Sequence, residues 1–113
     1  MAESCLFCRI VSGEIPAKIV SRSDQAVVFR DINPQAPSHL LVIPTQHVAS
    51  LNHVGAGVDL GFLLGVAADA ARQEGIDSSG YRVVVNTGEN GGQTVDHLHL
   101  HILGGRRMTW PPG

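Results

Sequence analysis

The chain has 113 residues, of which 43% are hydrophobic and 16% are charged, and its formal net charge is −2 at pH 7. This composition predicts one folded domain over residues 1–113 and argues against a disordered chain. The negative net charge argues against a nucleic-acid partner, because a protein binds phosphates with a basic surface. The apolar stretch Leu60–Ala68 is shorter than the roughly 18 residues that span a membrane, and "MAESC" lacks the apolar region of a secretory signal. We therefore expect a cytoplasmic protein with no membrane partner.

The first third of the chain predicts a short helix followed by strands. Cys5–Val11 has apolar residues at helical spacing, and Gly13 and Pro16 follow it as helix-ending residues. The runs "AVVF" (26–29) and "HLLVIP" (39–44) are apolar and rich in β-branched residues, so each predicts a strand. The segment "NPQAP" between them predicts a turn, because its two prolines lack a backbone donor.

Asp59–Glu74 is the one long segment with helical periodicity, and Gly75 follows it where a C-terminal cap is expected. One side of this helix carries an apolar stripe that we expect to face the core: Leu60, Leu63, Leu64, Ala67 and Ala71. The other side carries a strip of small residues: Gly61, Gly65 and Ala68. Such a strip indicates either simple tolerance of glycine or the close approach of a helix from a second subunit, and the sequence leaves both open.

The last third predicts two more strands. "YRVVVN" (81–86) is a strand candidate, "TGENGGQT" (87–94) is a glycine-rich loop, and "VDHLHLHIL" (95–103) predicts the final strand. Two or three strands, a helix and two further strands indicate the α+β class. We expect a mainly antiparallel sheet with one long and one short helix.

The final strand carries three histidines at alternate positions. Side chains alternate between the two faces of a strand, so His97, His99 and His101 should all project to one side. The apolar residues between them should then project into the core: Leu98, Leu100 and Ile102. On a regular strand the outer two histidines lie about 13 Å apart, so one tetrahedral zinc ion cannot bind all three. The three histidines must therefore have different roles.

The junction of the glycine-rich loop with this strand indicates a phosphate site beside an imidazole. The loop can direct backbone N–H groups toward an anion, and Thr94 adds a hydroxyl. A neutral imidazole is a competent nucleophile at phosphorus, and His99 lies between the other two histidines. We therefore expect His99 to be the nucleophile and His101, as an imidazolium, to donate to a phosphoryl oxygen or to the leaving group.

The segment "HLHLHIL" resembles the signature of the histidine triad (HIT) family, in which three histidines alternate with apolar residues. Four further segments resemble the Hint branch of this family: "CLFCRIVSGEIPAKIV", "FRDINPQAPSHLLVIPTQH", "VVVNTGENGGQT" and the terminal "WPPG". The resemblance implies a HIT-like fold, a homodimer and a nucleotide-binding hydrolase. It also implies that the substrates are purine nucleoside 5′-phosphoramidates, such as an AMP–amine conjugate, and that a nucleotidylated His99 is the intermediate.

The resemblance assigns roles to residues outside the triad. Asp31 would bind the ribose hydroxyls, although it could instead simply form a turn through its side chain. The wall of the base pocket would consist of Leu6, Phe7, Ile10, Phe29 and Ile32. The phosphate would be bound by Asn86, Gly92 and Thr94, together with His99 and His101. His39 would orient the triad, and Trp110 would reach the site of the partner subunit.

Two residues depart from the pattern of the family. Thr94 stands where the Hint branch often has serine, so the hydroxyl is kept and a methyl group is added. Asp96 stands where the animal members commonly have an aromatic residue. The methyl group of Thr94 could change the preference for the leaving group.

The spacing Cys5-x-x-Cys8 is that of a zinc half-site, because it allows both sulfurs to face one ion. The resemblance adds His47 and His97 as the remaining ligands, which would complete a closed, structural zinc site. His97 would then serve zinc, while His99 and His101 face the phosphate. The alternative is that the two cysteines are free thiols in a short helix.

Two other functions remain open from the sequence. The alternating histidines could bind a catalytic zinc ion, in which case the protein would be a zinc-dependent phosphoester hydrolase. The protein could also be a nucleotide-binding scaffold with weak catalysis. Removal of the metal separates the first alternative from a histidine nucleophile, since only a metal-dependent hydrolase stops as soon as a chelator is added.

Overall fold

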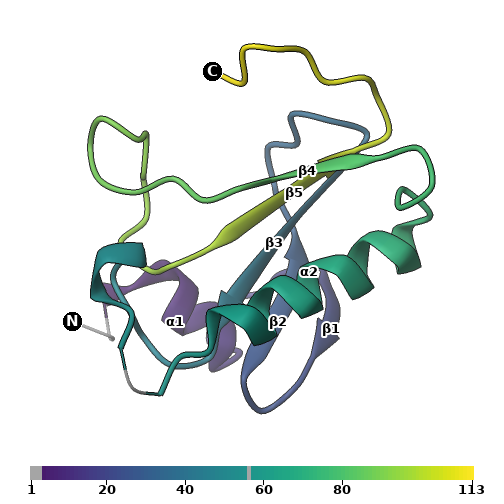
Figure 1. The fold of residues 1–113 in the computed structure, drawn as a ribbon. Helices are drawn as coiled ribbons and strands as arrows, with labels where there is room; N and C mark the ends of the chain where they lie inside the picture. The colour runs from purple at the N-terminus through teal and green to yellow at the C-terminus, as the bar shows by residue number, and fades with distance from the viewer. Residues whose placement is uncertain (1–3, 56) are drawn as a thin grey trace.

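The computed structural model describes residues 4–55 and 57–113. A five-stranded sheet with the strand order β1-β2-β3-β5-β4 forms its centre, and the four strand pairs are antiparallel (Figure 1). Its strands are β1 (Ile19–Arg22), β2 (Ala26–Arg30), β3 (Ser38–Pro44), β4 (Tyr81–Val84) and β5 (Leu100–Gly104). The helices are α1 (Leu6–Val11), the 3-10 helix η2 (Leu51–His53) and α2 (Leu60–Glu74). The expected α+β class with a mainly antiparallel sheet is confirmed.

Cys5 caps the N-terminus of α1, and its side chain accepts a hydrogen bond from the backbone N–H of Cys8 at 3.3 Å. Ser12 caps the C-terminus, and Gly13 follows with a φ of +80°. Phe7 and Ile10 are its buried residues. The cap places both sulfurs at the first turn of the helix, so α1 presents its two cysteines side by side.

Helix α2 has the caps that its sequence favours. The Asp59 side chain accepts the N–H of Phe62 at 3.0 Å, and Gly75 closes the helix in the left-handed region with a φ of +74°. The buried side of the helix is made of Leu63, Ala67, Ala70 and Ala71. The expectation that Leu64 belongs to the core is wrong, because its side chain is 52% exposed. The three alanines allow the helix to lie close to the sheet, and this orientation turns Leu64 outward.

The sheet separates two hydrophobic cores, because successive side chains of each strand point to opposite faces. Helix α2 lies across one face, and α1 lies on the other (Figure 1). In β3, Leu40 and Val42 belong to the core beneath α2, whereas Leu41 and Ile43 belong to the core that includes Phe7. Every residue of β3 is buried, as expected for a central strand that is covered on both sides.

The predicted strand 95–103 is only partly correct, since β5 begins at Leu100 and the two histidines before it lie outside the ladder. The expected projection of the apolar residues is nevertheless confirmed, because Leu98, Leu100 and Ile102 are all buried in the core beneath α2. Long-range hydrogen bonds explain the late start of β5. The N–H of Leu98 donates to the carbonyl of Val48 at 2.7 Å, and His97 Nε2 donates to the carbonyl of Pro44 at 2.9 Å. The last carbonyl of β3 thus accepts a hydrogen bond from the side chain of His97.

Among the described residues, no helix is long and apolar enough to cross a membrane.

Candidate functional site

A cavity of about 340 Å³ opens on the α1 side of the sheet, which is a volume suited to a small-molecule ligand. Nine of the residues proposed from the sequence line it: Leu6, Phe7, Ile10, Phe29, Asp31, Ile32, Thr94, His99 and His101. Five further residues also line it: Ile15, Pro16, Ala17, Leu41 and Val95. Leu41 could have been found from the sequence, because it follows His39 by two positions in the same strand. The other four lie outside the strands and helices, where periodicity gives no signal.

Aromatic rings form the floor of this cavity. The ring of Phe7 meets that of Phe29 edge to face at a centroid distance of 5.5 Å and that of His99 at 5.1 Å. At the mouth, Ile32 is 98% exposed and Leu6 is also exposed. The cavity therefore offers an apolar wall whose outer part is open to a planar ligand.

His99 is buried, and one of its two ring nitrogens is already bonded. Nδ1 lies 2.7 Å from the backbone carbonyl of His97, and a carbonyl can only accept, so Nδ1 carries the proton. In the neutral ring Nε2 is then unprotonated. The cavity is therefore lined by an imidazole whose free nitrogen has a lone pair.

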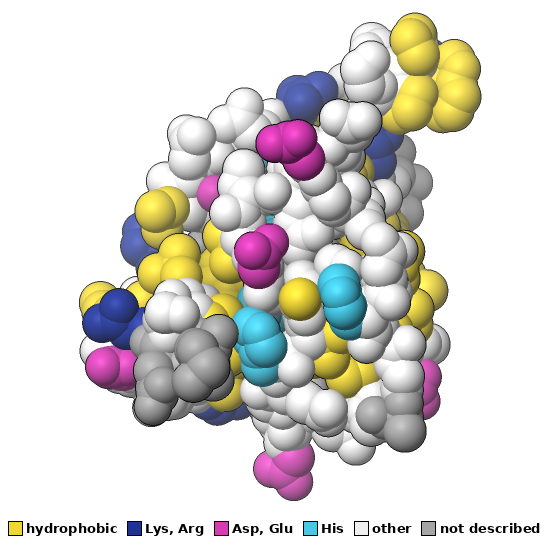
Figure 2. Space-filling model, turned by 90° about the vertical axis from the view of Figure 1, so that its left-hand side faces the viewer, with side chains coloured by type: hydrophobic (Ala, Val, Ile, Leu, Met, Phe, Trp, Pro, Cys, Tyr) yellow, Lys and Arg dark blue, Asp and Glu magenta, His cyan; other side chains and the backbone are white. Residues whose placement is uncertain are grey.

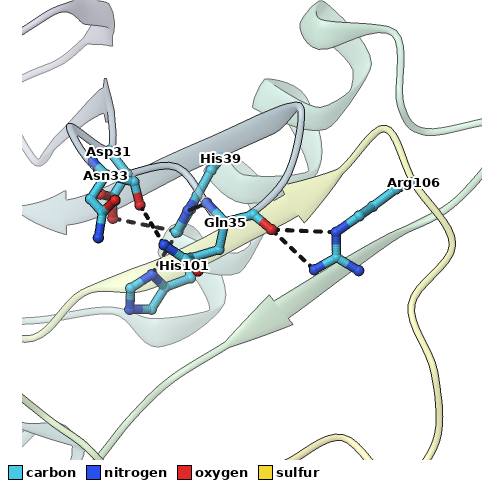
Figure 3. Close-up of polar contacts among 6 residues, drawn as sticks. All are labelled: Asp31, Asn33, Gln35, His39, His101 and Arg106. Atoms are coloured by element: carbon cyan, nitrogen blue, oxygen red, sulfur yellow. Dashed lines mark hydrogen bonds and ion pairs between the residues drawn. The ribbon is translucent and has the colours of Figure 1, made fainter.

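A chain of hydrogen bonds fixes the proton positions of His39 and His101 in the same way (Figure 3). The backbone N–H of Gln35 donates to His39 Nδ1 at 3.0 Å, so neutral His39 carries its proton on Nε2. This nitrogen lies 3.0 Å from His101 Nδ1 and 3.4 Å from Asp31 Oδ2. His101 Nδ1 therefore accepts, and the proton of neutral His101 is on Nε2. The two neighbouring rings thus differ, because His99 offers an acceptor at Nε2 and His101 offers a donor.

The electrostatic surroundings keep His101 and His39 neutral at neutral pH. The pKa of His101 is lowered to about 4, chiefly by burial and also by the neighbouring His99 and His39, while Asp31 opposes the shift. Burial also lowers the pKa of His39, and Asp31 again acts in the opposite direction. At neutral pH the donor is therefore a neutral ring and not the imidazolium that we expected from the sequence.

Asp31 takes part both in a turn and in the cavity. One carboxylate oxygen, Oδ1, accepts the backbone N–H of Asn33 at 2.8 Å, which is the turn contact considered above as an alternative. The other oxygen, Oδ2, faces His39, and the residue lines the cavity. The turn and a ligand contact are therefore compatible, because the turn uses only one oxygen.

The glycine-rich loop contributes Thr94 to the cavity, whereas Asn86 and Gly92 do not line it. The Asn86 amide donates to the carbonyl of Gly91 at 2.7 Å, and the N–H of Gly92 donates to the carbonyl of Glu89 at 3.0 Å. A side chain at position 91 would lie 2.3 Å from the carbonyl oxygen of Thr87, so the tight loop requires glycine there. These internal bonds hold the loop in shape, and Thr94 at its end lines the cavity.

Trp110 does not line the cavity, and its side chain is 83% exposed. A large apolar side chain with this exposure can contact a second molecule without rearrangement of its own chain.

A second cluster lies beside the cavity, where the ligand atoms of Cys5, Cys8, His47 and His97 are all within 4.8 Å of one another. His97 Nδ1 is 3.3 Å from Cys5 Sγ and 3.5 Å from Cys8 Sγ, and His47 Nδ1 is 3.2 Å from Cys8 Sγ. Tetrahedral zinc with ordinary bond lengths separates a sulfur from a nitrogen ligand by about 3.5 Å. His97 also donates from Nε2 to Pro44, which leaves Nδ1 as the ligand nitrogen. The four residues therefore fit a zinc ion.

Without a cation, the two sulfurs would not both be ionised. The pKa of the Cys8 thiol is raised to about 11, chiefly by burial and also by its hydrogen bond with Cys5 and its proximity to that residue. Both cysteines are free thiols, and neither is part of a disulfide. A bound divalent ion would favour the ionised form of both cysteines and lower the pKa of the Cys8 thiol, because thiolates are the form that binds metal.

The atoms of Asp31, His39 and His101 also lie within 4.8 Å of one another. Their nearest atoms are already joined by the hydrogen bond from His39 to His101. The nitrogen atoms that could bind a metal are therefore engaged with each other, and we interpret this group as a hydrogen-bonded chain.

Figure 2 shows a face of the molecule where histidine side chains reach the surface near the centre and acidic side chains lie close to them. The Lys and Arg side chains lie toward the margins of this face. Of the four residues in the cysteine–histidine cluster, His47 is the exposed one, whereas His97 is fully buried. The cluster thus reaches the surface at His47.

The five-stranded antiparallel sheet, the alternating histidines and the cavity beside them define a protein of the histidine triad type. The pattern of the HIT domain matches residues 12–108, and the chain belongs to this family.

Relatives support the same assignment. The chain is 48% identical to a purine nucleoside phosphoramidase of Escherichia coli K12 over 96% of this chain and 92% of the relative. It is similar to the crystal structure of a HIT family hydrolase from Legionella pneumophila, with a TM-score of 0.94 and 51% identity, covering 97% of this chain and all of the other. A zinc-bound histidine triad family protein from Mycobacterium smegmatis has a TM-score of 0.81 and 32% identity, covering all of this chain and 82% of the other. The expected HIT-like fold is confirmed.

We expect the His101 ring to remain neutral until the pH falls to about 4, because burial and two neighbouring histidines oppose its charge. The unfolded chain takes up this proton near pH 6.5, so the free energy of unfolding should fall as the pH drops from about 6.5 to about 4. An NMR titration of the His101 ring gives its midpoint directly. The variant His101→Asn should show a smaller loss of stability over the same pH range. A midpoint above pH 6 would contradict the expected shift.

Proposed function

We propose that this protein hydrolyses purine nucleoside 5′-phosphoramidates of the AMP–amine type through a nucleotidylated His99. The observation that carries the proposal is the pair of imidazoles at the cavity, in which His99 offers a bare Nε2 and His101 an N–H. A nucleophile beside a hydrogen-bond donor is what displacement at phosphorus requires. The similarity to the E. coli phosphoramidase supports the same reaction.

The reaction has two displacements at the α-phosphorus. In the first, His99 Nε2 forms a bond to phosphorus while the bond from phosphorus to the amine breaks, and the amine nitrogen takes a proton from solvent as it leaves. In the second, the oxygen of a water molecule forms a bond to phosphorus, the bond to His99 Nε2 breaks, and the water releases one proton to solvent, which balances the proton taken up in the first step. The Nε2–H of His101 donates to a non-bridging oxygen whose negative charge grows in each transition state. The products are AMP and the free amine.

The other residues of the cavity would bind the nucleotide. The purine would lie against Leu6, Phe7, Ile10, Phe29 and Ile32, which supply an apolar and aromatic wall. Asp31 would accept hydrogen bonds from the ribose hydroxyls through the oxygen that the turn leaves free. Thr94 would bind the phosphate, and Asn86 and Gly92 would assist through the glycine-rich loop. His39 positions His101 through the hydrogen bond between them.

Replacing His99 by alanine should remove the nucleophile and lower kcat for an AMP–amine substrate by more than about 10³-fold. The measurement combines steady-state hydrolysis with mass spectrometry after a rapid quench, in which wild type should carry an AMP adduct on His99. The matched control is His53→Ala, because His53 is an exposed histidine that bonds Ser50 outside the cavity. Hydrolysis by His99→Ala at the normal rate would refute the mechanism. A wild-type protein that binds the nucleotide without turnover would favour the scaffold alternative.

We propose that Cys5, Cys8, His47 and His97 bind a structural zinc ion. The distances among their ligand atoms and the zinc-bound relative from M. smegmatis support this site. With four protein ligands a tetrahedral zinc ion has no open position for water, so the metal would stabilise the fold without taking part in the reaction. Such a site needs cysteines that are not joined in a disulfide, and the two free cysteines agree with a reducing, cytoplasmic location.

Replacing His47 by alanine should abolish zinc binding and lower the melting temperature, because one of four ligands is lost. His53→Ala is again the matched control and should retain about one zinc ion per chain by elemental analysis. In wild type, a chelator should reduce activity no faster than it unfolds the protein by circular dichroism. Immediate loss of activity in a folded protein would instead indicate a catalytic metal.

We propose that the active form is a homodimer in which two α2 helices and two β4 edges meet. Three observations support it. The outward side of α2 carries the exposed Leu64 between Gly61 and Gly65, which allows a second helix to approach closely. Strand β4 is an edge of the sheet. Trp110 lies away from the cavity of its own chain, so it could close the cavity of a partner.

Replacing Leu64 by arginine should convert the dimer into a monomer, because two charges would face each other across the helix contact. Sedimentation velocity measures the mass of each species. Leu51→Arg is the matched control, since Leu51 is an exposed leucine in η2. A wild-type protein that sediments as a monomer at micromolar concentration would refute the dimer.

A further inference from the structure

We propose that Arg106 is a positioning residue that acts on His101 through the Gln35 turn and His39. The inference rests on the proposed function, in which His101 donates to the phosphoryl group. Arg106 lies beyond the end of β5, outside the cavity, and belongs to none of the groups described above. Its place in the chain of contacts is seen in Figure 3.

The guanidinium group of Arg106 holds the carbonyl oxygen of Gln35 with two N–H groups. Nε lies 3.3 Å and Nη2 3.0 Å from this oxygen, and Nη1 donates to the carbonyl of Arg107 at 3.3 Å. A hydrogen bond from a charged donor is stronger than one between neutral groups. The planar fork also fixes the direction of the carbonyl, which a lysine could not do.

The backbone before Arg106 is built for this approach. Gly105 has a φ of +88°, and a Cβ at this position would lie 2.9 Å from Cβ of Pro37. The chain can therefore turn back over the segment 34–37 only because glycine follows β5. This turn brings Arg106 to Gln35, which is far away in the sequence.

Gln35 needs such a support because it lies in an irregular segment. His39 belongs to β3 and is held by the sheet, where its carbonyl also accepts the N–H of Asp31 at 3.0 Å. Gln35 lies between β2 and β3, and its side chain donates to the carbonyl of Asn33 at 3.0 Å within the same turn. Arg106 adds a contact from outside the turn. It therefore helps to set where the backbone N–H of Gln35 points.

The direction of this N–H decides the proton positions of two histidines. While it donates to His39 Nδ1, the proton of His39 is on Nε2, and His101 is protonated on Nε2. Without the hydrogen bond from Gln35, His39 can carry its proton on Nδ1, and its Nε2 can accept a hydrogen bond from Nδ1–H of His101. Nε2 of His101 would then present a lone pair to the phosphoryl oxygen. The loss of Arg106 should thus replace a favourable donor by an unfavourable acceptor in part of the molecules.

The first test compares Arg106→Gln with Arg107→Gln, which removes the same charge at the adjacent, exposed position. We expect Arg106→Gln to lower kcat about tenfold and to change KM by less than about twofold, because the donor acts in the transition state. Arg107→Gln should leave both constants within about twofold of wild type. Equal losses in the two variants would overturn the proposal, because they would indicate an effect of charge alone.

The second test reads the proton position directly. Long-range ¹H–¹⁵N correlation spectra of the substrate-free protein should show His101 protonated on Nε2 in wild type. In Arg106→Gln the Nδ1 signal should move toward the protonated position. An unchanged spectrum in a folded variant with reduced kcat would overturn the proposal. Since these spectra need no substrate, they remain informative even if the wild type proves not to hydrolyse phosphoramidates.

The third test asks whether Arg106 acts through His101. In a His101→Ala background, adding Arg106→Gln should change the remaining rate by less than about twofold, because the group that Arg106 positions is gone. A further tenfold loss in the double variant would mean that Arg106 supports the fold in general, and it would overturn the proposed route.

Discussion

The chemistry of this site depends on which nitrogen of each imidazole carries the proton, and backbone groups decide this. The carbonyl of His97 takes the Nδ1–H of His99, the carbonyl of Pro44 takes the Nε2–H of His97, and the N–H of Gln35 donates to His39. Histidines in solution exchange freely between the two neutral forms. Here each of these rings is held in one form, so the proposed roles of nucleophile, donor and metal ligand fall to different rings and do not compete.

The two faces of the sheet explain how such a polar arrangement is tolerated inside a small protein. The face beneath α2 carries the larger hydrophobic core, which includes Leu98, Leu100 and Ile102, and these three residues fix the histidine segment to the sheet. The opposite face has a smaller core around Phe7 and Phe29, and the imidazoles lie at its border. Buried polar groups are costly unless they are hydrogen-bonded, and these imidazoles are bonded to backbone groups or to each other. The core beneath α2 thus supplies stability, while the other face holds the histidines that line the cavity.

The sequence predicts those features that depend on local pattern. Helix α2, strands β2 and β3 and the buried leucines of the triad follow from periodicity, and the cysteine spacing indicates a metal half-site. The start of β5 could not be predicted, because alternating residues look the same in a ladder and in an extended segment beside it. Leu64 was misassigned because only the orientation of α2 on the sheet separates it from Leu63. The support given by Gln35 was missed because its contact with His39 is made by its backbone.

His97 connects the proposed zinc site with the proposed nucleophile, His99. Its Nδ1 lies among the sulfurs, its Nε2 is bonded to Pro44, and its carbonyl accepts the proton of His99. Because both ring nitrogens are engaged, the ring cannot rotate without breaking contacts on two sides. The carbonyl belongs to the same residue, so holding the ring also limits the movement of the group that orients His99. If zinc binds there as proposed, it would improve the reaction without taking part in it, because it would stiffen the residue whose carbonyl orients His99.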